Sequence, residues 1–190
     1  MKGKILLLSI MACLLASCVK NQAMPTTNGT TKPSLPTAID PDQDGDAKGV
    51  NTFPQKEAAT GRNVFIFDPK LTAWAAYDAN GNLVNTGRAS GGRSFCPDVG
   101  RSCKTIVGTF KVLSKGDSTC ESSIYPLETN GGAPMPYCMK FSAKGYAIHG
   151  SDYVPDYNAS HGCIRVTPTA AAWLSQYFIT NGTTVIVRSY

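Results

Sequence analysis

The only long apolar run of this 190-residue chain lies at its start, from Ile5 to Ala16. Its twelve residues are too few to cross the hydrocarbon core of a bilayer, which takes roughly 20 helical residues. The run follows the basic residues Lys2 and Lys4, and this layout is typical of a secretory signal peptide. A protein with several membrane spans is therefore excluded, and the fold must be built from the residues that follow the signal.

The run ends in Leu15-Ala16-Ser17-Cys18, which resembles the lipobox of bacterial lipoproteins. That resemblance implies that residues 1–17 are removed and that Cys18 is acylated, which anchors the chain to a membrane because each buried methylene adds about 0.8 kcal/mol. Val19, in place of an aspartate, matches the sorting pattern of Gram-negative outer-membrane lipoproteins. We therefore expect an exported protein on the periplasmic face of the outer membrane. A plain signal peptide with a chance cysteine is the alternative.

The composition and net charge of the remaining chain limit the functions that it can have. A hydrophobic fraction of 42% with 16% charged residues is that of an ordinary globular protein. The formal net charge of +5 falls to +3 without Lys2 and Lys4, and no basic stripe is interleaved with aromatic residues. Nucleic-acid binding is therefore not expected.

Residues 18–61 contain few bulky apolar side chains and many Pro, Thr, Asn, Gly and Asp residues. Such a segment cannot bury enough surface to offset its ordering entropy, so we predict a flexible tether. Within it, residues 40–46 mimic the first half of a calcium-binding loop. Asn51 stands where a bidentate glutamate would close that loop, so a solvated acidic turn is the expected structure.

Residues 62–190 are expected to form one domain. Runs typical of strands occur at residues 63–68, 72–77, 83–84, 108–113, 145–149 and 183–188. The one good helix is predicted to start at Thr167-Pro168, with a hydroxyl cap and a proline in the first turn, and to end near Phe178. Mostly antiparallel strands with a single helix predict a mainly β fold, either a sandwich or a partly closed barrel.

Export also determines how the seven cysteines are interpreted. Cys13 would leave with the signal, and Cys18 would carry lipid. The five that remain are an odd number in an oxidising compartment: Cys96, Cys103, Cys120, Cys138 and Cys163. Four can pair, which leaves one free thiol, and the absence of a Cys-x-x-Cys motif argues against a zinc site.

Both histidines of the chain, His149 and His161, lie within fifteen residues before Cys163. An imidazole can lower the pKa of a nearby thiol by stabilising its thiolate, and it can later protonate a leaving amine. Gly162 lets the backbone turn tightly and can aim amide groups at a developing oxyanion. These are the parts of a cysteine acyl-transfer site. The residues alone also allow a disulfide at Cys163, or structural or metal-binding histidines.

The sequence Ser160-His161-Gly162-Cys163-Ile164-Arg165, with Ile148-His149-Gly150 upstream, resembles the signature of the L,D-transpeptidase catalytic domain of the YkuD type. The resemblance covers most of residues 62–190, and residues 105–110 resemble the family's Thr-Pro-x-Gly-x-Phe segment. The run at residues 131–139 is similar to the subgroup of enhanced-entry lipoproteins. The family implies a β-sandwich or partly closed barrel with one main helix after the catalytic cysteine.

The resemblance also implies the chemistry. Cys163 would attack a peptidoglycan stem tetrapeptide and form a thioester, with His149 as base and then acid, while His161 shapes the site. Four further positions are implied for orienting the base, binding substrate or holding the oxyanion: Gly150, Ser160, Gly162 and Arg165. An amine acceptor on another stem would give a 3→3 crosslink, and a lipoprotein lysine would give attachment to the wall.

Several alternatives remain open beside this interpretation. Water as acceptor would make the chain an L,D-carboxypeptidase, and a domain that only grips stem peptides would be a non-catalytic wall-binding lipoprotein. A papain-like amidase is disfavoured, because such enzymes place the cysteine before the histidine and here His149 comes first. Fast alkylation of a low-pKa Cys163 would distinguish an enzyme from a binding protein.

The resemblance implies no cofactor and no metal, and we expect a monomer. The four other cysteines are atypical of the family, and they are expected to brace loops that line the cleft. Four cysteines allow three pairings. Of these we prefer Cys96 with Cys103 and Cys120 with Cys138.

Overall fold

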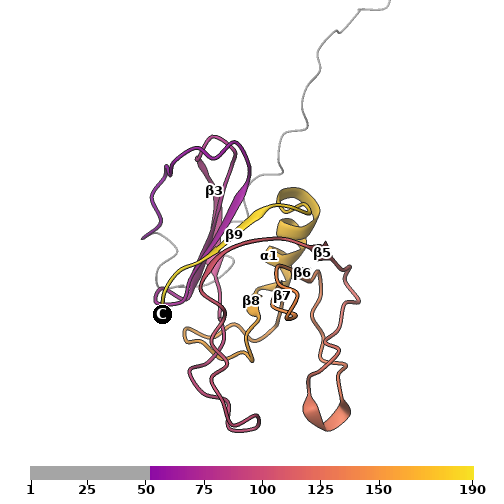
Figure 1. Ribbon diagram of the computed structural model, residues 1–190. Coiled ribbons are helices and arrows are strands. Elements are labelled where there is room, and N and C mark those ends of the chain that lie inside the picture. The colour runs from indigo at the N-terminus through magenta and orange to yellow at the C-terminus, as the bar shows by residue number, and fades with distance from the viewer. Residues whose placement is uncertain (1–51) are drawn as a thin grey trace, which may run out of the picture. The chain divides into compact units, whose positions relative to one another are not determined.

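The computed structural model describes residues 52–190. Figure 1 shows the arrangement of its strands and helices. In chain order the elements are β1 (Val64–Asp68), β2 (Ala73–Tyr77), β3 (Leu83–Arg88), β4 (Gly108–Lys111), β5 (Ser114–Lys115), the 3-10 helix η3 (Leu127–Thr129), β6 (Met139–Lys140), β7 (Ala147–Gly150), β8 (Ile164–Val166), α1 (Pro168–Trp173), the π-helix η4 (Leu174–Phe178) and β9 (Thr184–Val187). Within residues 52–190, no helix is both long and apolar enough to cross a bilayer. The expected signal peptide, the lipidation at Cys18 and the acidic turn lie outside the described residues.

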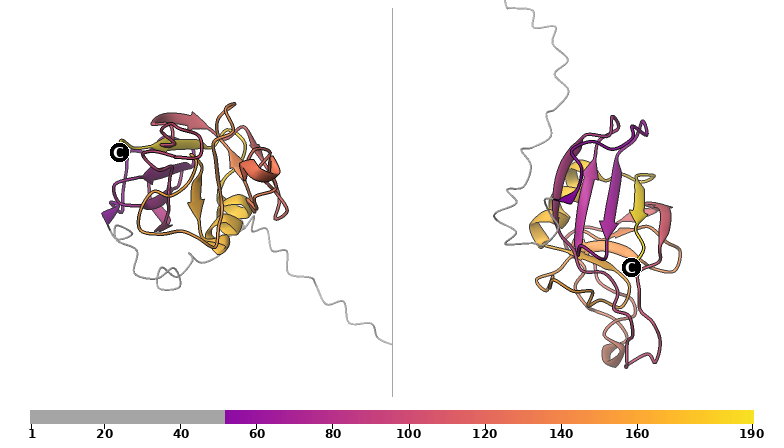
Figure 2. Two further views of the ribbon diagram at one scale, coloured as in Figure 1. Left: turned by 90° about the horizontal axis from the view of Figure 1, so that it is seen from below. Right: turned by 90° about the vertical axis from the view of Figure 1, so that its left-hand side faces the viewer.

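The first sheet has the strand order β3-β2-β1-β9-β4, and the right-hand view of Figure 2 shows its strands side by side. β1 and β2 are buried along their whole length because both faces of this sheet are covered. Alternate side chains point to opposite faces, so Phe65 and Trp74 join the main core while Ile66 and Ala75 join a smaller cluster behind the sheet.

The folded region begins before residue 62, where the sequence analysis placed its start. Phe53 is buried in the smaller cluster, and the Tyr77 hydroxyl donates to the carbonyl of Pro54 over 2.8 Å. The Glu57 amide donates to the Gly81 carbonyl. The buried Phe53 side chain and these hydrogen bonds together hold residues 53–61 against the sheet.

The second sheet, in the order β5-β6-β7-β8, packs its buried face on the main core. Within that core, Trp173 of α1 stacks on Trp74 of β2, with ring centroids 6.4 Å apart. The helix α1 packs against β7, and Gly150 makes this approach possible. A β-carbon at Gly150 would lie 3.2 Å from the β-carbon of Ala171.

The mainly β architecture with one main helix after Cys163 is confirmed, and two details differ from the sequence analysis. The expectation of mostly antiparallel strands is confirmed as well, because five of the seven strand pairs are antiparallel and only the β1–β9 and β7–β8 pairs are parallel among the described residues. The predicted helix begins with the Thr167 side chain accepting from the Ala170 amide, as expected, but it widens into η4 after Trp173. The Lys115 ammonium binds the carbonyls of Ser175 and Ile179 there, which satisfies backbone groups at the helix end. The sequence analysis did not predict the short strands β5, β6 and β8, because two or three residues show no clear alternation of polar and apolar side chains.

Phe65 tests how much the core contributes to stability. The side chain is fully buried and its ring stacks on Trp74 at 5.8 Å, so Phe65→Ala should lower the free energy of unfolding by about 3–5 kcal/mol. The exposed Tyr177 supplies the control, and Tyr177→Ala should cost less than about 0.5 kcal/mol. Urea unfolding measures both values, and equal losses would contradict this assignment of the core.

Candidate active site

A cleft of about 420 Å³ opens beside the second sheet. Its lining comes from the loop between β5 and β6, from β6 and β7 with the turn between them, and from the segment that leads into β8, with Arg101 added from the loop between β3 and β4. Cys163, His149 and His161 all line this cleft. A second hollow of about 370 Å³ shares only Ser151 with the cleft, and it contains none of these three residues.

The parallel pairing of β7 and β8 brings the thiol and one imidazole to the same cleft. His149 is paired with Arg165 in the register, so their side chains project from the same side of the sheet. Cys163 lies in the bend directly before β8, and it lines the same cleft as His149 and Arg165. His149 and Cys163 are fourteen residues apart in the sequence, and the pairing of β7 with β8 brings both to one cleft.

His149 is held as a neutral imidazole. Its Nδ1 lies 2.8 Å from the carbonyl oxygen of Gly150, and because a carbonyl only accepts, Nδ1 carries the proton. The Nε2 of the neutral ring therefore has a lone pair. Burial lowers the pKa of His149 to about 4. The positive charge of Arg165 adds to this decrease, and the bond to Gly150 opposes it. The ring is thus an unprotonated base at neutral pH.

Cys163 carries the one free thiol among the described residues. Its Sγ lies 3.8 Å from the carbonyl oxygen of Gly145. Burial raises the pKa of the thiol, while the Ala147 amide and the charges of Arg165 and Lys140 oppose that change. The expectation of a thiol with a lowered pKa is therefore wrong for the substrate-free cleft, because desolvation outweighs the nearby positive charges.

A tight turn places Cys163. The Ser160 hydroxyl donates to the Cys163 carbonyl and accepts from the Gly162 amide at 3.0 Å. Gly162 has a φ of 131°, and a β-carbon there would lie 2.7 Å from the Tyr146 ring. Glycine is required at this position for both reasons, and the Gly162 amide is already bonded within the turn.

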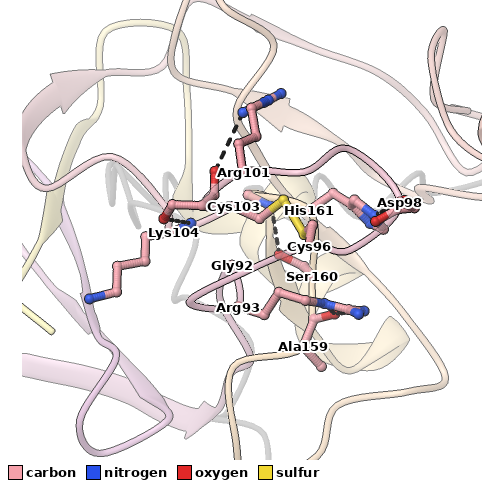
Figure 3. The surroundings of a disulfide bond; sticks show 12 residues. Gly92, Arg93, Cys96, Asp98, Arg101, Cys103, Lys104, Ala159, Ser160 and His161 are labelled. Atoms are coloured by element: carbon pink, nitrogen blue, oxygen red, sulfur yellow. Dashed lines mark hydrogen bonds and ion pairs between the residues drawn. A yellow bond between two sulfur atoms is a disulfide. The ribbon is translucent and has the colours of Figure 1, made fainter.

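His161 lies in a different setting from His149. Its Nε2 is 2.6 Å from the Asp98 carboxylate, and its ring stacks on Tyr125 with centroids 4.3 Å apart. Figure 3 shows Asp98 and His161 in contact beside the disulfide of the preceding loop. Because Nε2 is bonded to Asp98, His161 is poorly suited to act as the base.

Two disulfides connect Cys96 to Cys103 and Cys120 to Cys138, which are the pairs preferred from the sequence. One cluster of metal-ligand type occurs in the described part of the chain, formed by Cys96, Asp98 and His161, with ligand atoms within 4.8 Å. The sulfur of Cys96 is bonded to Cys103, so this cluster does not offer a thiolate ligand in the oxidised protein.

The residues predicted for catalysis, substrate binding or the oxyanion lie in or next to this cleft. The lining includes His149, Ser160, His161, Gly162, Cys163 and Arg165, and Gly150 supplies the carbonyl that orients His149. Sequence reasoning missed Asp98 and Tyr125, because each lies in a loop far from His161 along the chain. The only signal for either residue was its position inside a cysteine-bounded loop.

The comparisons with known proteins agree with this architecture. Residues 61–187 match the L,D-transpeptidase catalytic domain family, YkuD, and the chain belongs to that family. No curated protein matches the chain.

Three solved structures illustrate the likeness in fold. An L,D-transpeptidase from Xylanimonas cellulosilytica is 28% identical, with a TM-score of 0.59 over 72% of this chain and 65% of that one. An L,D-transpeptidase from Mycobacterium smegmatis is 22% identical, with a TM-score of 0.55 over 67% and 59%. L,D-transpeptidase 3 from Mycobacterium tuberculosis, in complex with a faropenem-derived adduct, is 23% identical, with a TM-score of 0.54 over 67% and 60%. The chain thus spans less than two thirds of the length of each.

The raised pKa of the Cys163 thiol predicts how alkylation depends on pH. The rate of reaction with iodoacetamide should still be rising at about pH 9, because only the thiolate reacts. Mass spectrometry of the peptide that contains Cys163, over a series of pH values, gives this rate without interference from other cysteines. A plateau reached below pH 7 would show that the thiol is ionised at neutral pH and would contradict the prediction.

Proposed function

We propose that this protein is a peptidoglycan L,D-transpeptidase that forms a thioester between Cys163 and a stem tetrapeptide. The observation that carries the proposal is the presence, in one cleft beside the second sheet, of a free thiol and a neutral imidazole whose Nδ1 is bonded to the Gly150 carbonyl. Such a pair lowers the barrier to acyl transfer because the base receives the thiol proton as the sulfur attacks. Membership of the family supports the same reaction.

In the proposed first step, the sulfur of Cys163 bonds to the carbonyl carbon of the third stem residue. The Nε2 of His149 accepts the thiol proton, and the Gly150 carbonyl stabilises the imidazolium through Nδ1. The bond to the terminal D-Ala then breaks, and His149 returns the proton to the leaving amine. In the second step an acceptor amine attacks the thioester carbonyl carbon and His149 takes the amine proton. The bond between that carbon and the Cys163 sulfur then breaks, and His149 returns the proton to the sulfur, which frees the thiol again.

The charge of the cleft supports a substrate that carries carboxylates. Four basic side chains line it against one acidic side chain: Arg101, Lys140, Lys144 and Arg165, against Glu121. No ion pair among the described residues involves Arg165, whose guanidinium lies 6.0 Å from the Tyr153 ring centroid. We assign Arg165 to a stem carboxylate, since a partly buried cation gains most from a charged partner.

The wider proposal concerns where the enzyme works and what accepts the acyl group. A lipid on Cys18 would hold the chain at the periplasmic face of the outer membrane, and the following residues would let the domain reach the wall. The acceptor would be an amine of a second stem or of a lipoprotein. The run at residues 131–139 supports placing the chain in the enhanced-entry lipoprotein subgroup. An L,D-carboxypeptidase and a wall-binding lipoprotein are the competing functions.

Purified tetrapeptide muropeptides test the reaction directly. Wild-type protein should convert them into dimers that lack one D-Ala, and Cys163→Ala should form none, because that variant lacks the nucleophile. Mass spectrometry of the products distinguishes the competing functions. Tripeptide without dimers would indicate a carboxypeptidase. No product from wild-type protein that still binds the muropeptide would overturn the catalytic proposal and leave a wall-binding protein.

Imipenem offers a second test, because one solved L,D-transpeptidase is in complex with imipenem and another carries a faropenem-derived adduct. We expect imipenem to acylate Cys163, with a rate that increases as the pH rises through about 4 and then stays level through pH 6.5. The lowered pKa of His149 leaves the base neutral over that whole range. Mass spectrometry of the adduct gives the rate, and an acid limb near pH 6.5 would contradict the assignment of a buried base.

A further inference from the structure

The ring of His161 is held from two sides by two separate loops. Asp98 lies in the loop closed by the Cys96–Cys103 disulfide, and Tyr125 lies in the loop closed by the Cys120–Cys138 disulfide. Tyr125 and His161 both line the cleft. Two loops that are distant in sequence thus both contact His161, which lies two positions before Cys163.

The residues just before the loop that carries Asp98 are hydrogen-bonded to the segment before Cys163. The Arg93 amide donates to the Ser160 carbonyl at 3.0 Å, and the Arg93 guanidinium donates to the Ala159 carbonyl at 2.7 Å. Figure 3 shows these residues beside the disulfide. Cys96 and Cys103 are almost fully buried, with exposed fractions of 0% and 1%, so the base of the loop is fixed while Asp98 reaches outward.

The carboxylate of Asp98 is the polar part of this arrangement. It accepts from His161 and, as a result, its pKa is lowered, with a further contribution from the charge of Arg93. The Asp98 side chain is 41% exposed and the His161 side chain 24% exposed, so neither belongs to the hydrophobic core. A contribution to general stability is therefore not the main consequence of this pair, because exposed ion pairs contribute little.

We propose that Asp98 is a positioning residue that acts through His161, fixing its ring against Tyr125 and thereby the Ser160–Cys163 turn that presents the nucleophile. The proposal rests on the proposed acyl-transfer function. Misplacing a reacting group by about 1 Å can cost on the order of 100-fold in rate. Loss of the carboxylate should accordingly slow acylation of Cys163 without exposing or burying the thiol.

Two reactions of the Cys163 sulfur distinguish a loss of positioning from a general loss of folded structure. Acylation by imipenem needs the thiol, the base and the oxyanion donors in register, whereas alkylation by iodoacetamide develops no oxyanion and needs no fit to the cleft. Both rates are measured on the full-length protein by mass spectrometry of the Cys163 peptide. Thermal unfolding of each variant is recorded alongside.

Asp98→Ala should acylate about 10–100-fold more slowly than wild type, with an alkylation rate within about twofold. Asp98→Asn should recover most of the acylation rate, because its amide oxygen can still accept from the His161 Nε2–H group. Asp78→Ala is the matched control, since Asp78 accepts hydrogen bonds from Asn80 and Asn82 in a turn outside the cleft. It should leave both rates unchanged.

Two results would overturn the positioning role of Asp98. One is an Asp98→Ala variant that acylates at the wild-type rate, and the other is a parallel fall of both rates together with the unfolding temperature. A wild-type protein that neither forms the imipenem adduct nor converts tetrapeptides would instead overturn the proposed function, and the positioning role with it.

Discussion

The parallel pairing of β7 with β8 is the constraint on which the site depends. It aligns His149 with Arg165, and Cys163 directly precedes β8, so these three positions share one cleft. A shift of one residue in this register would turn His149 to the opposite face, because side chains alternate along a strand. The close packing of α1 on Gly150 favours the observed register, since that glycine must face the helix.

The same burial that positions the two reacting groups also sets their protonation. Desolvation penalises charge on both, so it raises the pKa of the Cys163 thiol and lowers that of the His149 imidazole. The two groups are consequently a thiol and a neutral imidazole, and in the proposed reaction proton transfer has to accompany attack. Such a thiol reacts slowly with small electrophiles near neutral pH, because only the thiolate is nucleophilic.

Local patterns predicted the parts of the structure that depend on neighbours in sequence. The strands at β1, β2 and β9, the capped helix after Thr167 and the turn from Ser160 to Cys163 all follow from alternation, capping and glycine. The parallel pairings and the Asp98–His161 contact depend on residues tens of positions apart, for which one sequence carries no signal. The pKa of Cys163 depends on the summed burial of the cleft, so a nearby imidazole alone suggested the wrong direction.

The disulfides explain how irregular loops can hold a precise site. The segments around Asp98 and Tyr125 have little regular structure, and few of their side chains are buried in the main core. Backbone hydrogen bonds within these loops, such as those from the Cys96 amide to the Arg101 carbonyl and from the Ser122 amide to the Ala133 carbonyl, act together with a covalent link that restricts the conformations each loop can adopt. The Cys96–Cys103 disulfide thereby helps to hold Asp98 against His161. An oxidising compartment favours this arrangement, because it preserves the disulfide.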